Sequence, residues 1–305
     1  MAWEYEGLFD AMPESGEEDL LSEYWKTEIT ATRIGRMGYR TRTIKAGTRL
    51  EAEVYPIFGK SMEQTARREK QNMTAERQSQ LNTRRAKRRL VLLMETNFRV
   101  DEDIHVTLTY ANSEFRIQNS ELSAAAEEEQ KLKRVRKDMR NFLCRVKRLR
   151  EKRGLDELKY IYAIGHDRDQ RIHIHCVMNG GIGRDELERI WKKGYANTMR
   201  LQNQGKGLQG MANYLYRQNE KAKDNGERIG YHMWSGSRIL KKPKVRTSDT
   251  KMSNRKVKMI AQNFRAMAKE IMERVYPGYT LEDGRVYLSD VVDGVYIRCV
   301  MRATQ

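Results

Sequence analysis

The stretch Arg171-Ile172-His173-Ile174-His175-Cys176-Val177 decides the expected fold, because histidines and apolar residues alternate along it. Successive side chains of a β-strand point to opposite faces, so His173 and His175 share one face and the apolar residues share the other. Two imidazoles on a rigid strand supply half of the ligands of a divalent metal site. Three of the five histidines of the chain fall between residues 166 and 175. The pattern therefore predicts a strand with a metal-binding face.

A second strand is predicted just before it, over 159–164, where aromatic and β-branched residues gather. If residues 167–170 form the turn of a hairpin, residue 164 lies opposite His173 and residue 162 opposite His175. His166 then becomes a diagonal neighbour of His173 and a candidate third metal ligand. A surface histidine at the edge of the loop explains His166 nearly as well. A register shift of one residue would move every side chain to the other face.

The remaining elements follow from hydrophobic periodicity. The basic run 61–94 has no glycine or proline and predicts a long helix, and 104–110 predicts a strand. Further predicted elements are helices over 124–153, 184–191, 211–223 and 252–275, a strand over 195–201, and a hairpin built on 286–288 and 295–300. Residues 31–60 are expected to form loops and short extended pieces. The fold class is thus α+β: an antiparallel β-sheet with helices on one face, a long basic helix before it and a small helix–hairpin extension after it.

These elements suggest a division of the chain into three parts. Residues 1–60 form an acidic arm and an irregular segment, 61–250 form the main domain with its leading basic helix, and 251–305 form the C-terminal extension. The first 30 residues hold nine acidic residues and one basic residue, although the whole chain carries a net charge of +17. The rest, with 58 basic and 33 acidic residues, has a charge near +25. Such a body indicates a polyanionic partner, most often nucleic acid, rather than a merely solvated surface.

Other function classes are disfavoured by the composition. No run of about 18 apolar residues is present, so we expect no membrane partner. The N-terminus lacks a basic and apolar leader. The three cysteines have neither zinc spacing nor an even-numbered disulfide pattern, which favours a cytoplasmic setting. The chain also lacks a Gly-x-x-x-x-Gly-Lys phosphate loop, so no helicase activity is expected.

The predicted helix 211–223 carries a second set of reactive side chains. Tyr214, Arg217, Gln218 and Lys221 recur at helical spacing and share a face. A metal can neutralise the charge of a phosphodiester, and nearby cations can lower the pKa of a tyrosine. We therefore predict Tyr214 as a nucleophile that is assisted by Arg217 and Lys221.

At these residues the chain resembles the HUH (His-hydrophobic-His) single-strand endonucleases, and more narrowly the rolling-circle replication-associated proteins of plasmids, prophages and filamentous phages. The resemblance extends from about residue 75 to 302 and covers most of the chain. The motifs that carry it are Asn97-Phe98, Thr107-Leu108-Thr109-Tyr110, His173-Ile174-His175, Tyr214-Leu215-Tyr216-Arg217 and Ser237-Arg238-Ile239-Leu240-Lys241-Lys242-Pro243.

The resemblance implies an HUH/RRM-like fold and a metal-dependent, site-specific nicking endonuclease that starts rolling-circle replication through a 5′-phosphotyrosine link. It implies Mg²⁺ or Mn²⁺ on His173 and His175, with His166 as the third ligand. The implied partners are single-stranded or hairpin origin DNA and the host helicase and polymerase. Candidate DNA contacts are Thr107, Thr109, Arg134, Lys137, Arg171, Lys241 and Lys242.

Two positions depart from the family pattern. Gly165 stands near the place where relatives carry a carboxylate, and Arg217 replaces a lysine. Two alternative functions follow. One is a transposase or mobilisation relaxase with the same fold. The other is a DNA-binding module that has lost nuclease activity, for which Gly165 is the main argument.

Overall fold

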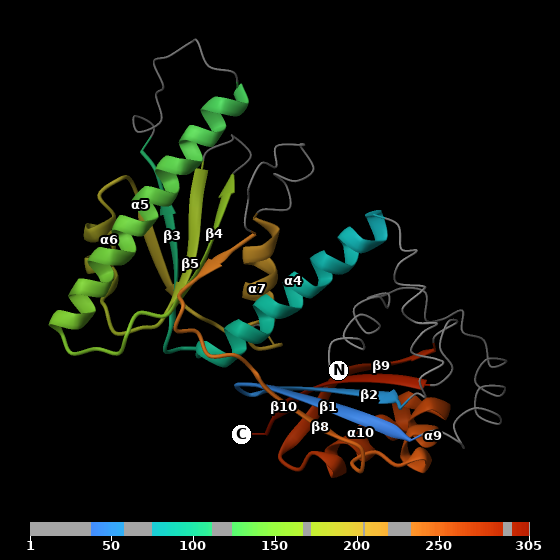
Figure 1. Ribbon diagram of the computed structural model, residues 1–305. Helices are drawn as coiled ribbons and strands as arrows, with labels where there is room; N and C mark the ends of the chain where they lie inside the picture. The colour runs from blue at the N-terminus through green and yellow to red at the C-terminus, as the bar shows by residue number, and fades with distance from the viewer. Residues whose placement is uncertain are drawn as a thin grey trace. The chain divides into compact units, whose positions relative to one another are not determined.

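The computed structural model describes residues 38–57, 75–111, 124–166, 172–203, 205–218, 233–288 and 295–304. The chain divides into two compact units: the first comprises residues up to Leu92 together with those from Lys242 onward, and the second comprises Leu93–Lys241. Each unit contains an antiparallel sheet with helices (Figure 1), so the predicted α+β class is confirmed. In the part of the chain that is described, no helix is long and apolar enough to cross a membrane.

The second unit is built on a five-stranded sheet whose strands all pair antiparallel. Its order is β6 (Ala196–Arg200), β3 (Ile104–Thr109), β5 (Ile172–Met178), β4 (Tyr160–His166) and β7 (Ser235–Gly236). Helices α5 (Ala124–Lys152) and α6 (Arg184–Trp191) cover the face that carries Ile172, Ile174 and Cys176. Helix α7 (Gln209–Arg217) lies on the other side of the sheet (Figure 1). The helices are therefore not confined to one face, and the histidine face has a helix of its own.

The hairpin of β4 and β5 forms as predicted, but its register differs from the prediction by one residue. Gly165 lies opposite His173, and Ala163 lies opposite His175. His166 pairs with Ile172, a position of the opposite face, and its side chain lies outside the described part of the structure. The predicted register was wrong because loop length alone was used to set it. The reason for placing His166 beside His173 is thereby removed.

The first unit is built on a second five-stranded antiparallel sheet. Its order is β8 (Lys244–Ser248), β1 (Tyr39–Ala46), β2 (Arg49–Pro56), β10 (Val295–Ala303) and β9 (Tyr279–Leu288). Helices α9 (Asn254–Gln262) and α10 (Phe264–Val275) bury their apolar side chains against one face of the sheet. Helix α4 (Ala75–Asn97) contributes residues up to Leu92 to this unit and its last turn to the second. The stretch 58–74, where the predicted basic helix begins, lies outside the described residues.

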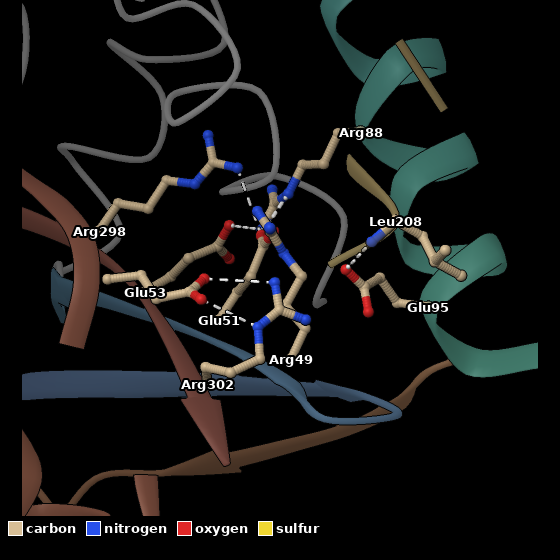
Figure 2. A network of polar contacts seen from close by, with 9 residues as sticks. Arg49, Glu51, Glu53, Arg88, Glu95, Leu208, Arg298 and Arg302 are labelled. Carbon is tan, nitrogen blue, oxygen red and sulfur yellow. Dashed lines mark hydrogen bonds and ion pairs between the residues drawn. The ribbon is translucent and has the colours of Figure 1, made fainter. Parts of the chain in front are cut away.

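The hairpin of β1 and β2 was missed by the sequence analysis, which expected loops there. Its strands alternate apolar and charged residues, and the charged positions of β2 are buried. Glu51 is fully buried and receives the guanidinium groups of Arg49, Arg88 and Arg298 at 2.8, 2.6 and 3.3 Å. Figure 2 shows these cations converging on the carboxylate. Glutamate and arginine in a strand suggested solvent exposure, whereas here they satisfy one another inside the unit.

The C-terminal part also departs in detail from its prediction. The single helix expected over 252–275 is two helices, because the Asn263 side chain accepts a hydrogen bond from the backbone of Ala266 and caps α10. The predicted hairpin exists and is longer on both sides than expected. It does not form an extension of its own, since β10 pairs with β2 in one continuous sheet.

Candidate active site

The three central strands of the second unit place polar side chains together on the histidine face. Residues 105, 107 and 109 of β3 alternate to the same face as His173 and His175, because Thr107 pairs with His175 and Thr109 with His173. The His105 Nε2 atom lies 3.1 Å from His175 Nδ1, and Thr107 Oγ1 lies 3.2 Å from the same nitrogen. His175 is thus held from behind by two neighbours on β3.

Tyr214 on α7 reaches this histidine from the front. Its hydroxyl oxygen lies 3.1 Å from His175 Nε2, and the two rings meet edge to face at a centroid separation of 4.9 Å. The Tyr214 side chain remains 42% exposed, whereas Tyr216, the rival nucleophile, is only 3% exposed. The structure therefore brings together the predicted nucleophile and one predicted ligand, and it turns Tyr216 into the core.

Gln218 completes the cluster one helical turn after Tyr214. Its Oε1 atom lies 3.2 Å from His173 Nε2, and its Nε2 atom donates to the Tyr214 carbonyl at 3.4 Å. Gly165 makes this position possible, since a Cβ atom there would lie 2.9 Å from both Gln218 Oε1 and His173 Nε2. An amide oxygen therefore occupies the space toward which a side chain at position 165 would point. The sequence analysis placed Gln218 on the face of Tyr214 but gave it no role.

The two inner histidines of the cluster are held in their neutral form. Burial, followed by the neighbouring His173 and His105, lowers the pKa of His175 to about 3. Burial lowers the pKa of His105 to about 4. His175 is therefore neutral near pH 7, and its ring keeps a lone pair for a hydrogen or a metal ion. Burial also raises the pKa of Tyr214, which is opposite to the effect expected from nearby cations.

The last turn of α4 fixes the segments that carry this cluster. The Glu95 carboxylate accepts the backbone N–H of Leu208, where α7 begins, at 3.1 Å. The Asn97 side chain donates to the Lys241 carbonyl at 2.8 Å and accepts the Lys241 N–H at 2.7 Å. Two of the sequence motifs therefore meet in space, and the Asn97 motif serves to hold the backbone of the other.

The remaining predicted site residues are spread around the unit. Arg217 is exposed, and in the described structure no hydrogen bond or ion pair joins it to the histidines or to Tyr214. Lys221 and Arg171 lie outside the described residues. Arg134 and Lys137 belong to α5, on the face opposite to the histidines. Thr109 donates to the Tyr195 carbonyl at 3.2 Å, and Lys241 and Lys242 are exposed.

The histidine face is open beyond β3. Tyr195, just before the edge strand β6, is 82% exposed, and Met199 within that strand is 53% exposed. Met199 pairs with His105, so it lies on the histidine face. Large apolar side chains on a polar, basic protein are suited to stacking against unpaired bases. The sequence analysis had no signal for this surface, because it depends on β6 being the edge of the sheet.

The donor atoms of the cluster fit a divalent metal ion. Within the described residues, no group of three or more His, Cys, Asp and Glu side chains is arranged to hold a metal. The cluster nevertheless offers two imidazole nitrogens and the Gln218 amide oxygen, which is an acceptor outside that residue set. A mixed set of nitrogen and oxygen donors suits ions such as Mn²⁺ or Mg²⁺ better than it suits soft metals.

Comparison with known proteins supports a role in replication. Residues 103–223 match the family model described as replication-associated protein ORF2/gene 2 protein. The matched segment contains β3, both histidines of β5, Tyr214 and Gln218. No curated protein and no solved structure matches the chain significantly. The match thus covers the candidate site and most of the second unit, and it supports a replication-associated protein with DNA as its partner.

Proposed function

We propose that the chain is a metal-dependent endonuclease that nicks one DNA strand at an origin and remains joined to it through Tyr214. The observation that carries the proposal is the Tyr214 hydroxyl, which lies 3.1 Å from His175 Nε2 on a half-exposed helix face. The replication-associated family match supports DNA as the substrate. The same match favours initiation of replication over transposition or mobilisation.

Three side chains are proposed to hold the metal: His173, His175 and Gln218. Gln218 takes the role that a carboxylate at position 165 has in relatives, which weakens the argument that Gly165 marks an inactive protein. A bound divalent ion would supply positive charge to the non-bridging phosphate oxygens. His105 and Thr107 act as positioning residues, because they hold His175 Nδ1 and thereby orient Nε2.

The proposed reaction is a transesterification at phosphorus. The Tyr214 oxygen loses its proton and forms a bond to phosphorus, while the bond from phosphorus to the 3′ oxygen breaks. The leaving oxygen takes up a proton, so the products are a free 3′-OH and a 5′ phosphate ester of Tyr214. The number of phosphoester bonds is unchanged, and the link keeps the energy needed to rejoin the strand.

The hydrogen bond between Tyr214 and His175 represents the protein without metal. His175 Nε2 has one lone pair, so it can accept the Tyr214 hydroxyl or bind a metal but cannot do both. Tyr214 is therefore released from His175 when the site is loaded. Because burial raises the pKa of Tyr214, the positive charge of the site is needed to favour its deprotonated form.

A covalent-adduct assay tests this function. The protein is incubated with single-stranded DNA from the origin region and Mn²⁺, and the expected product is a 5′-linked protein–DNA species of reduced mobility. Tyr214→Phe is expected to abolish the product. The matched variant Tyr216→Phe alters a buried residue of the same helix and is expected to retain it. Adduct formation by Tyr214→Phe at the wild-type rate would refute the assignment of the nucleophile.

A further inference from the structure

The first unit contains a pocket of about 490 Å³ that has no part in the proposed nicking site. The end of α10 and strands β1, β8 and β9 surround it. Three cations line it, namely Lys45, Arg246 and Lys251. The hydroxyl-bearing and aromatic lining residues include Thr43, Ser248, Thr250, Tyr276 and Tyr279. A pocket of this size accommodates a nucleotide-sized group.

The positive charge of this pocket is not balanced by acidic groups. None of the described residues that line it is acidic, and none of its three cations forms an ion pair in the described structure. Asp249, the acidic residue closest in sequence, is bound in two places by Arg40 at 2.6 and 2.8 Å. Burial, together with Lys45 and Arg246, lowers the pKa of Lys251. Cations that repel one another in a concave site are stabilised by an anion.

The side chains are also ordered in a way that suits a ligand. Lys251 Nζ lies 4.2 Å from the centroid of the Tyr276 ring, and Lys45 Nζ lies 5.2 Å from that of Tyr279. The Tyr276 hydroxyl is fixed at 2.7 Å from Thr43 Oγ1. Two ammonium groups are thus held over aromatic rings, which positions them without neutralising their charge.

The positive surface continues beyond the pocket along the sheet edge. Lys45 lies directly opposite Lys244 in the pairing of β1 with β8, although like charges in such pairs are unfavourable. Arg246 is two residues further along the same edge strand, on the same face. Charges on an edge strand can serve only to prevent sheet aggregation. That role does not require Lys45 and Lys251, which lie off the edge strand, to converge on the pocket. A line of cations leading into a pocket fits a polymeric anion better than a single nucleotide.

We infer that this pocket and edge form a second DNA site, which binds the sugar-phosphate backbone of a DNA strand independently of the nicking site. The inference rests on the proposed function only for the identity of the polyanion. Each phosphate that a cation neutralises releases counterions, so the site must contribute to the salt dependence of DNA binding.

A comparison of two triple variants tests the site in the full chain carrying Tyr214→Phe, which removes the proposed nucleophile. The pocket variant is Lys45→Gln/Arg246→Gln/Lys251→Gln. The control, Lys258→Gln/Arg265→Gln/Lys269→Gln, makes the same change of charge on exposed positions of α9 and α10. Fluorescence anisotropy with a labelled duplex and a labelled single strand, over a series of salt concentrations, gives the slope of log K against log[salt]. Thermal unfolding by circular dichroism checks that both variants fold.

The pocket variant is expected to reduce the magnitude of that slope by about 2 to 3, because three phosphate contacts are lost, while the control leaves it nearly unchanged. Equal slopes for the two variants would overturn the inference. So would binding of dAMP to the pocket as tightly as an oligonucleotide, since the site would then belong to a nucleotide. The adduct assay with Tyr214 intact reports separately on nicking, so failure of one proposal does not imply failure of the other.

Discussion

The two sheets bury polar side chains in opposite ways. In the first unit, the Glu51 carboxylate is surrounded by three arginines of the same unit. In the second unit, His175 and Gln218 are neutral groups that present acceptor atoms, and Tyr214 beside them is half-exposed. The first arrangement is complete without a ligand, whereas the second offers lone pairs to a metal ion.

The difference teaches how to separate structural from functional polar clusters in this chain. Burial alone would raise the pKa of Glu51, but Arg88, Arg298 and Arg49 outweigh it and hold the pKa well below its ordinary value. Burial of His175 acts without an opposing carboxylate and leaves the ring neutral. A buried charge that is fully paired specifies a fold. Buried neutral donors beside a small residue such as Gly165 specify a binding site.

The largest expected effect is loss of the ion-pair cluster in the first unit. Glu51→Gln leaves three arginines without this counter-charge, and breaking a buried pair in this way costs about 3–5 kcal/mol. Amide hydrogen exchange of peptides from β1 and β2 is expected to accelerate accordingly. Glu270→Gln removes an exposed pair with Arg274 and is expected to cost about 0–1 kcal/mol. Similar protection in the two variants would mean that the cluster is not what holds this hairpin.

This cluster also marks the limit of what the sequence could predict. The apolar stripes of α5 and β5 were recognised because periodicity reports burial directly. Strands β1 and β2 were missed because a pattern of charges does not reveal that the charges meet one another. For the site, Tyr214 and both histidines followed from their motifs. Gln218 and His105 depended on a strand register and a helix orientation that fix side chains only in three dimensions.

Metal binding is the next sharpest test of the contrast between the units. Gln218→Ala is expected to weaken Mn²⁺ binding about 10- to 100-fold, as measured by isothermal titration calorimetry, because it removes the oxygen donor. Gly165→Ala is expected to weaken it as well, since a Cβ would displace Gln218 and His173. Tyr214→Phe serves as the control and is expected to bind Mn²⁺ at least as tightly as the wild type, because the competing hydrogen bond is lost. Unchanged affinity in Gln218→Ala would exclude Gln218 as a ligand.

The open part of the histidine face offers a smaller effect. Tyr195→Ala is expected to weaken binding of a single-stranded oligonucleotide by about tenfold, because stacking of one base on an aromatic ring contributes about 1–3 kcal/mol. Duplex binding is expected to change little, since paired bases are already stacked. Met199→Ala provides a non-aromatic comparison on the same face. An equal loss for duplex and single strand would indicate a contact other than stacking.

The smallest expected effect is a difference in acid sensitivity between the units of the metal-free protein. The pKa values of His105 and His175 fall from the ordinary 6.5 to about 4 and about 3 on folding. The unfolded chain therefore binds protons first as pH falls below 6.5, and stability of the second unit decreases over that range by at most about 1.4 kcal/mol per pH unit for each histidine.

Glu51 also has a lowered pKa, but its ordinary value is 4.5, so its contribution is lost only below that pH. Urea unfolding followed by the fluorescence of Trp191, which is buried in the second unit, measures the first effect. Hydrogen exchange of β1 and β2 measures the second. His105→Asn is expected to flatten the pH dependence of the second unit and leave that of the first unchanged. If the variant kept the wild-type slope, neutral burial of His105 would not be a source of that sensitivity, and the contrast between paired charge and neutral donors would lose its thermodynamic basis.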